Sequence, residues 1–146
     1  MQTILNPRTP PKEELAPRLR LAVTRMARRL RQEAGTDLGP SGVAALATIE
    51  RHGPISPSEL AERERIKRPT TTRIVASLEG SGLIERVRDP EDGRASILTV
   101  TAEGRRLLRR LRARKTAYLA TRLERLDAAD RRTLECAAEL LEGMLE

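Results

Sequence analysis

The 146-residue chain is nearly devoid of aromatic side chains: Tyr118 is the only one, and phenylalanine and tryptophan are absent. Strands are usually rich in aromatic and β-branched residues, so this shortage argues against a large sheet. The core must be built from leucine, isoleucine, valine and alanine. We therefore expect a mainly helical fold.

Cysteine and histidine are just as scarce, with Cys136 and His52 the only examples. A single cysteine excludes an intrachain disulfide and indicates a reducing compartment. One cysteine and one histidine far apart cannot form a zinc site from one chain's sulfur and nitrogen ligands, so we expect no metal and no cofactor. Cys136 is interpreted as a small buried hydrophobic residue, with redox sensing as the alternative.

Long apolar runs are missing too, which excludes a membrane-spanning helix, and no membrane is expected among the partners. Residues 1–11 form a short polar arm without the apolar stretch of a signal peptide, and we expect a cytoplasmic protein. The sequence contains no phosphate-cradling glycine loop and no nucleophile elbow, and its one histidine has no catalytic partner. It is not expected to be an enzyme.

What the chain has in abundance is positive charge. Its net charge is +7 and its pI about 10.8. Such a balance favours a polyanionic partner, although a merely soluble charged surface would give the same totals. The position of the charge along the chain has to decide between these interpretations.

Four helices are expected in the first half, because apolar residues recur there every three or four positions. They cover residues 12–34, 40–52, 57–64 and 69–79. Gly35 is a plausible end for the first helix. Ser56 and Glu59 form a capping box at the start of the third.

The period changes to strict alternation in residues 83–88 and 97–100, on either side of a turn-forming stretch at 89–93. This pattern predicts a β-hairpin that packs on the helices. A long helix from Thr101 to Leu126 and a last helix capped by Asp127 or Asp130 follow. The order predicts a winged helix-turn-helix at 36–101, between dimerisation segments at 1–35 and 102–146, all in one continuous domain.

Leucine stripes on the outer helices are larger than a domain of this size can cover. Such stripes usually pack against a partner helix, and a twofold dimer is the simplest closed arrangement. We therefore expect a homodimer. Its interface residues are expected to be Leu15, Leu19, Leu134, Leu141 and Leu145.

Several motifs, in the right order, resemble one family. Residues 92–104, from Asp92-Gly93-Arg94 to Thr101-Ala102-Glu103-Gly104, are similar to the wing signature of the MarR family of bacterial regulators. Residues 59–62 and 68–75 resemble that family's helix-turn-helix, and residues 78–86 resemble its link into the wing. The resemblance extends over roughly residues 15–145.

This resemblance implies a triangular dimer whose first and last helices form the interface. It implies binding to inverted-repeat DNA near promoters, usually as a repressor. For many members it also implies release by a small phenolic or lipophilic effector bound between the dimerisation and DNA-binding regions. Tyr118 is the only candidate aromatic lining residue, so an aliphatic pocket and no effector at all remain alternatives.

The candidate DNA contacts follow from the same assignment. A recognition helix reads base edges with residues near its N-terminus, and an arginine at a wing tip enters a narrow minor groove. Asp92 is expected to orient an arginine of the wing. The predicted DNA-binding residues are Arg94, Arg73, Thr70, Thr71, Thr72, Arg68, Lys67, Ser56, Ser58, Arg86 and Arg88.

Two departures from the family pattern concern the turn before the recognition helix. Lys67 stands where a small capping residue is common, so the helix is expected to start less firmly. The basic run 65–67 would strengthen phosphate binding more than sequence choice. The rival functions are a non-specific architectural DNA-binding protein and a winged helix that docks a protein partner.

Overall fold

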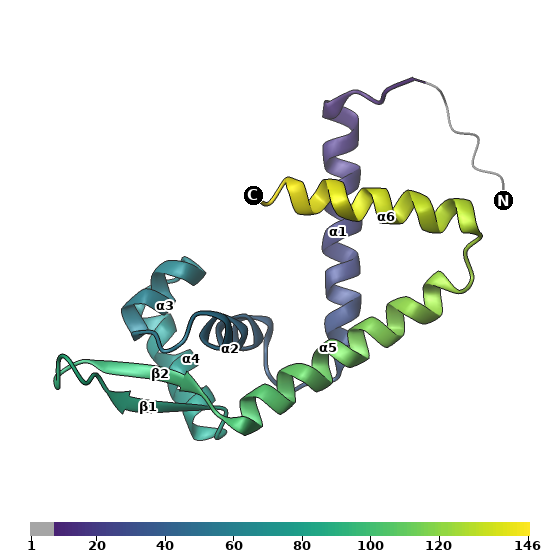
Figure 1. The fold of residues 1–146 in the computed structure, drawn as a ribbon. Helices are drawn as coiled ribbons and strands as arrows, with labels where there is room; N and C mark the ends of the chain where they lie inside the picture. Colours follow the sequence, from purple (N-terminus) through teal and green to yellow (C-terminus); the bar gives the residue numbers. More distant parts are fainter. Residues whose placement is uncertain (1–7) are drawn as a thin grey trace.

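The computed structural model describes residues 8–146, which form six α-helices and a two-stranded sheet (Figure 1). The predicted order of four helices, a hairpin and two helices is confirmed. Most of the predicted arm, residues 1–7, lies outside the described residues. The elements are α1 (Lys12–Ala34), α2 (Pro40–His52), α3 (Pro57–Glu64), α4 (Arg68–Gly80), β1 (Ile84–Arg88), β2 (Ser96–Val100), α5 (Ala102–Leu123) and α6 (Ala128–Gly143).

Local capping sets most of the helix boundaries. The Ser56 hydroxyl accepts a hydrogen bond from the Glu59 amide at 3.1 Å, which satisfies one of the free amides at the start of α3. Asp127 caps α6 in the same way at 2.8 Å. Gly35 ends α1 with a φ of 63°, a left-handed conformation that favours glycine. These sequence predictions are confirmed.

Two helix boundaries differ from the predictions. Helix α5 ends at Leu123 rather than Leu126, because residues 124–126 form a turn that leads into the Asp127 cap. Helix α4 begins at Arg68, one residue before its proline, which the first turn tolerates because the proline needs no amide partner there.

The main core lies among α2, α3, α4, the hairpin and the start of α5. It is aliphatic throughout, as the composition requires. Its buried residues are Ala45, Leu46, Ile49, Ile55, Leu60, Val75, Leu78, Leu83, Ile84, Leu98 and Leu108. Strands β1 and β2 pair antiparallel from Ile84↔Val100 to Arg88↔Ser96, and Ile55 bridges to Leu98 on the other edge of β2.

Helix α5 leads away from this core toward α1 and α6 (Figure 1). The α1–α5 pair is tied by Arg114, whose guanidinium donates to the Ala34 carbonyl oxygen at 2.7 Å. Helix α6 has no buried residue in the single chain. Cys136, expected to be buried, is instead exposed, because residues 8–146 leave every side chain of this helix at least partly uncovered.

Within residues 8–146, no helix has the length and apolar content needed to cross a bilayer.

Candidate nucleic-acid interface

Helices α3 and α4 form the helix-turn-helix, joined by the short turn at residues 65–67. Arg65 has a φ of 52°, and its amide bonds back to the Glu62 carbonyl at 3.2 Å. The Ile66 amide bonds to the Ala61 carbonyl at 3.1 Å. These bonds close α3 and turn the chain so that the N-terminus of α4 lies beside that of α3.

Helix α4 has one face in the core and the opposite face in solvent. Thr71, Val75 and Leu78 are buried on the inner face, at the spacing of adjacent turns. Arg73 is exposed on the other side. Arg73 thus lies opposite the buried face of α4.

Thr71 is a correction to the predicted contact residues. It is only 2% exposed, and its hydroxyl donates to the Lys67 carbonyl at 3.1 Å, so it cannot reach DNA. The spacing of Thr71 with Val75 and Leu78 would have identified it as a core position. Thr72 is exposed instead, with its hydroxyl on the Arg68 carbonyl at 3.0 Å.

The start of α4 has no side-chain cap, because the N-cap position is occupied by Lys67. This agrees with the prediction of a less firmly started helix. Amides of an uncapped first turn are free to bind an anion such as a phosphate oxygen, and Lys67 and Arg68 are both exposed beside them.

Three of the exposed predicted contact residues meet between the two helix N-termini. Ser58, Arg68 and Thr72 line a small hollow of about 130 Å³, together with Pro57 and the buried Thr71. Ser56 lies nearby in sequence, but its hydroxyl is used as the α3 cap. Of the two serines, Ser58 is the exposed one.

The wing loop is shaped by its own acidic residues. The Asp92 carboxylate accepts a hydrogen bond from the Arg94 amide at 3.1 Å, and the Asp92 carbonyl accepts from the Ala95 amide at 2.9 Å. The Asp89 carboxylate accepts from the Glu91 amide at 2.9 Å. Asp92 thus fixes the backbone of Arg94 rather than its guanidinium, and the Arg94 side chain is exposed.

An ion pair ties the wing to the recognition helix. The Arg86 guanidinium on β1 lies 3.4 Å from the Glu79 carboxylate on α4. This contact, between residues on two different elements, was not predicted from the sequence. Arg86 is therefore partly engaged within the protein, whereas Arg88, two residue pairs further toward the tip, is exposed with no ion pair among residues 8–146.

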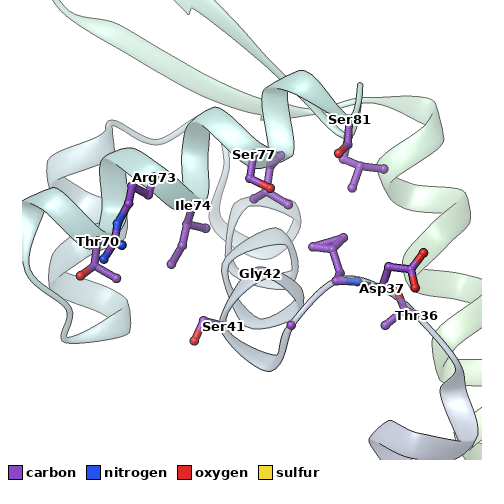
Figure 2. Close-up of a pocket in the computed structure, with 13 residues that line it drawn as sticks. Thr36, Asp37, Ser41, Gly42, Thr70, Arg73, Ile74, Ser77 and Ser81 are labelled. Atoms are coloured by element: carbon purple, nitrogen blue, oxygen red, sulfur yellow. Dashed lines mark hydrogen bonds between the residues drawn. The ribbon is translucent and has the colours of Figure 1, made fainter.

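A hollow of about 560 Å³ lies between α4 and the loop that joins α1 to α2 (Figure 2). Thr70, Ile74 and Ser77 form one row along α4, which Ser81 continues just beyond its end, and line the hollow from one side. Asp37 lies on the loop opposite (Figure 2). The serines and Asp37 were not among the predicted site residues, although the spacing of the α4 row marks a single helix face.

A second cavity, of about 710 Å³, lies between α1, the start of α2 and α5. Its wall is mostly aliphatic, with basic side chains and one acidic side chain among the charged groups. These are Arg28, Arg31 and Lys115, and Asp37. The α1–α2 loop separates it from the hollow beside α4. Thr36, Asp37, Leu38 and Gly39 of that loop line both hollows.

Tyr118, the candidate aromatic lining residue, does not line this cavity. Its ring lies beneath the guanidinium groups of Arg29 and Arg122, at 5.4 and 5.1 Å from the ring centroid. The described part of the chain also contains no group of three or more metal-ligating side chains. His52 instead lies 3.5 Å from a guanidinium nitrogen of Arg63.

Comparison with known proteins agrees with this arrangement. A model of the MarR family matches residues 40–96, which span the helix-turn-helix and most of the wing. An HTH-type transcriptional regulator of Mycobacterium tuberculosis is 35% identical over 133 residues, 90% of this chain and 93% of that protein.

Solved structures show the same fold over nearly the whole chain. A Pseudomonas aeruginosa PA01 protein assigned to the transcriptional regulators is 34% identical, with a TM-score of 0.85 over 95% of this chain and 99% of its own. A mutant of MepR from Staphylococcus aureus, bound to an oligodeoxyribonucleotide, is 17% identical with a TM-score of 0.70 over 90% and 98% of the two chains. At that identity the likeness is one of fold alone.

Proposed function

The chain belongs to the MarR family of DNA-binding transcriptional regulators, and from this premise we propose that it is a homodimeric repressor of an inverted-repeat operator. The supporting observation is that two exposed arginines lie on adjoining elements. Arg73 projects from the outer face of α4 and Arg94 from the wing, and the Arg86–Glu79 ion pair links the two elements. This arrangement suits one element in a major groove and the other in the adjacent minor groove.

The proposed contacts divide into two kinds. Arg73, Thr70 and Thr72 would reach base edges, where a guanidinium pairs with guanine and a threonine with several bases. Phosphate contacts would come from the remaining exposed groups around the site, which position the protein but do not read sequence. These are Lys67, Arg68, Ser58, Arg86 and Arg88.

Selection of bound duplexes from a random-sequence pool tests this function. We expect one inverted repeat, with half-sites about 10 base pairs apart centre to centre, or a multiple of that spacing. A footprint on a selected duplex should then show two symmetric protected segments. Continuous protection without a preferred sequence would support an architectural protein, and no protection would support a protein-docking module.

The homodimer is supported by surface that the single chain leaves uncovered. Leu134 is 48% exposed and Leu145 88% exposed on the α6 side, and Leu15 is 42% exposed on α1. Leu19 and Leu141, the other predicted interface residues, are half-buried. The exposed stripes extend beyond the predicted set to Val23, Met26, Leu140 and Met144.

Charge on the outer helices complements the apolar surface. Residues 127–146 carry six acidic and two basic side chains, whereas α1 carries seven basic and three acidic ones. An acidic α6 of one copy packed on the basic α1 of a second copy would bury the leucines and pair these charges. We propose that this contact between α6 of one copy and α1 of the other forms the dimer interface.

The cavity between α1, α2 and α5 is the proposed effector site. An aliphatic wall with Arg28, Arg31 and Lys115 at one site suits a lipophilic acid, whose tail contacts the leucines and whose carboxylate meets a basic group. Octanoate should raise the melting temperature of the protein and release the selected operator, and 1-octanol should do neither. Release by both compounds, or by neither, would contradict this effector class.

Both the operator and such an effector would be encountered in the cytoplasm, which is where we propose that the protein acts.

A further inference from the structure

The net positive charge of this chain does not lie on its winged helix-turn-helix. Residues 36–101 hold nine basic and ten acidic side chains, whereas α5 alone holds eight basic and one acidic. Because attraction to a polyanion depends on local charge, it is expected to be strong along α5, which lies outside the helix-turn-helix.

Four exposed arginines occupy one side of the first turns of α5. The opposite side of these turns is buried through Gly104, Leu108 and Leu111. With 3.6 residues per turn, two adjacent pairs of arginines lie one above the other on the outer side. This arginine face consists of Arg105, Arg106, Arg109 and Arg110.

The arginine face is hardly used within the chain. Arg106 pairs with Glu103, the one acidic residue of the helix, and the other three arginines of the face make no ion pair within residues 8–146. Other arginines of α5 do hold the fold: Arg112 lies 2.9 Å from the Glu50 carboxylate, and Arg114 bonds the Ala34 carbonyl. Removing the face should therefore leave the fold intact.

The composition of the face indicates which partner it fits. The other side chains on this side of the helix are short, at Ala102 and Ala113. A protein interface needs an apolar core, and a membrane-bound helix needs an apolar stripe, and neither is present on this face. Arginines without apolar neighbours instead match the phosphate backbone of a nucleic acid, which is bound through charge and carries no sequence information.

We propose that the arginine face is a second DNA-binding surface, which holds the phosphate backbone of duplex DNA without sequence preference. Its position is next to the operator-binding elements, because α5 starts at the base of the wing. Thr101 caps α5 through the Gly104 amide, and its hydroxyl donates at 2.7 Å to the Gly82 carbonyl just beyond α4. The proposal rests on DNA binding by the family and is independent of the operator.

Salt titration of binding to a 30-base-pair duplex of arbitrary sequence tests the second surface. In the variant R105Q/R106Q/R109Q/R110Q, four phosphate contacts are lost while glutamine keeps the helix favourable. The slope of log K against log salt should become less negative by about 3.6 for each copy whose face lies on the duplex, at roughly 0.9 per phosphate. The charge-preserving variant R105K/R106K/R109K/R110K should restore the wild-type slope, and R131Q/R132Q on α6 should leave it unchanged.

The other outcomes either overturn the proposal or separate it from the repressor function. An unchanged slope and affinity in the glutamine variant, with an unchanged melting curve, would overturn the proposal. Dissociation of the dimer by the same variant would also overturn it and would show that a second copy covers the face. If the glutamine variant shows the predicted change in slope but the wild type gives no operator footprint, the repressor function fails while the second surface stands.

The DNA segment on the face could come from the operator's own flanks or from another duplex. Affinity that rises with flank length only in the wild type would identify the flanks. Bridging of two labelled duplexes by the wild type, absent in the glutamine variant, would identify a second duplex.

Discussion

Arg94 lies in a turn whose backbone is held by Asp92, so its guanidinium is presented without contributing to the core. R94A should therefore weaken operator binding by between about fivefold and 150-fold, the usual loss for one specific arginine contact. Gel shift with a selected operator measures this loss. The melting temperature should stay at the wild-type value.

The matched control for this change is R131A, which removes an exposed arginine from α6, far along the chain from the wing. It should bind the operator as the wild type does. Equal affinities of the R94A and R131A variants would remove Arg94 from the DNA interface.

Single residues also show what the sequence leaves undetermined. Three consecutive threonines look alike as letters, yet Thr71 is buried while Thr72 is exposed, and only the phase of the helix separates them. That phase was readable from Val75 and Leu78. The Arg86–Glu79 pair was not readable, because it depends on how the strand crosses the helix.

At the scale of elements, the junction between wing and α5 is tightly packed. A Cβ added to Gly104 would lie 2.3 Å from the Leu83 carbonyl oxygen and 2.7 Å from a Val100 methyl. G104A should therefore lower the free energy of unfolding by about 1–3 kcal/mol or more, the usual cost of overpacking. Urea unfolding measures the change.

Gly80 provides the control, because a Cβ there would have no neighbour within 4 Å. Gly80 is the last residue of α4. G80A should therefore raise the free energy of unfolding by roughly 0.5–1 kcal/mol, because alanine lowers the backbone entropy of the unfolded chain. Comparable destabilisation by G104A and G80A would mean that the junction lacks this close contact.

Most element boundaries were predictable because the signals are local. Capping residues such as Ser56 and Asp127, and glycine at position 35, act within one helical turn of themselves. The end of α5 was missed because Leu126 continues the leucine stripe through a turn. The two cavities could not be predicted from local signals, because both depend on how a loop lies between helices.

At the scale of the whole molecule, the single chain leaves apolar surface of its outer helices uncovered. Helix α6 buries none of its residues, and Leu140 on it is 71% exposed. Light scattering at micromolar concentration should give the mass of a dimer. Replacement of Leu140 and Leu134 by glutamate should shift the mass to that of a monomer, because each buried charge without a partner is costly.

Glutamate at exposed positions 131 and 132 is the control for this change, and R131E/R132E should remain dimeric if charge alone does not decide assembly. A monomeric mass for the wild type would contradict the proposed homodimer. An inverted-repeat operator would then no longer be expected.

The central claim is that two wings, one from each copy, lie in minor grooves on either side of a common dyad. Attachment of an iron–EDTA cleavage reagent through G93C, in a chain whose exposed Cys136 is replaced by serine, tests it directly and leaves Arg94 in place. On a selected operator we predict two cleavage clusters, symmetric about the centre of the repeat and offset as minor-groove cutting requires. A single cluster, or uniform cleavage along the duplex, would contradict the account.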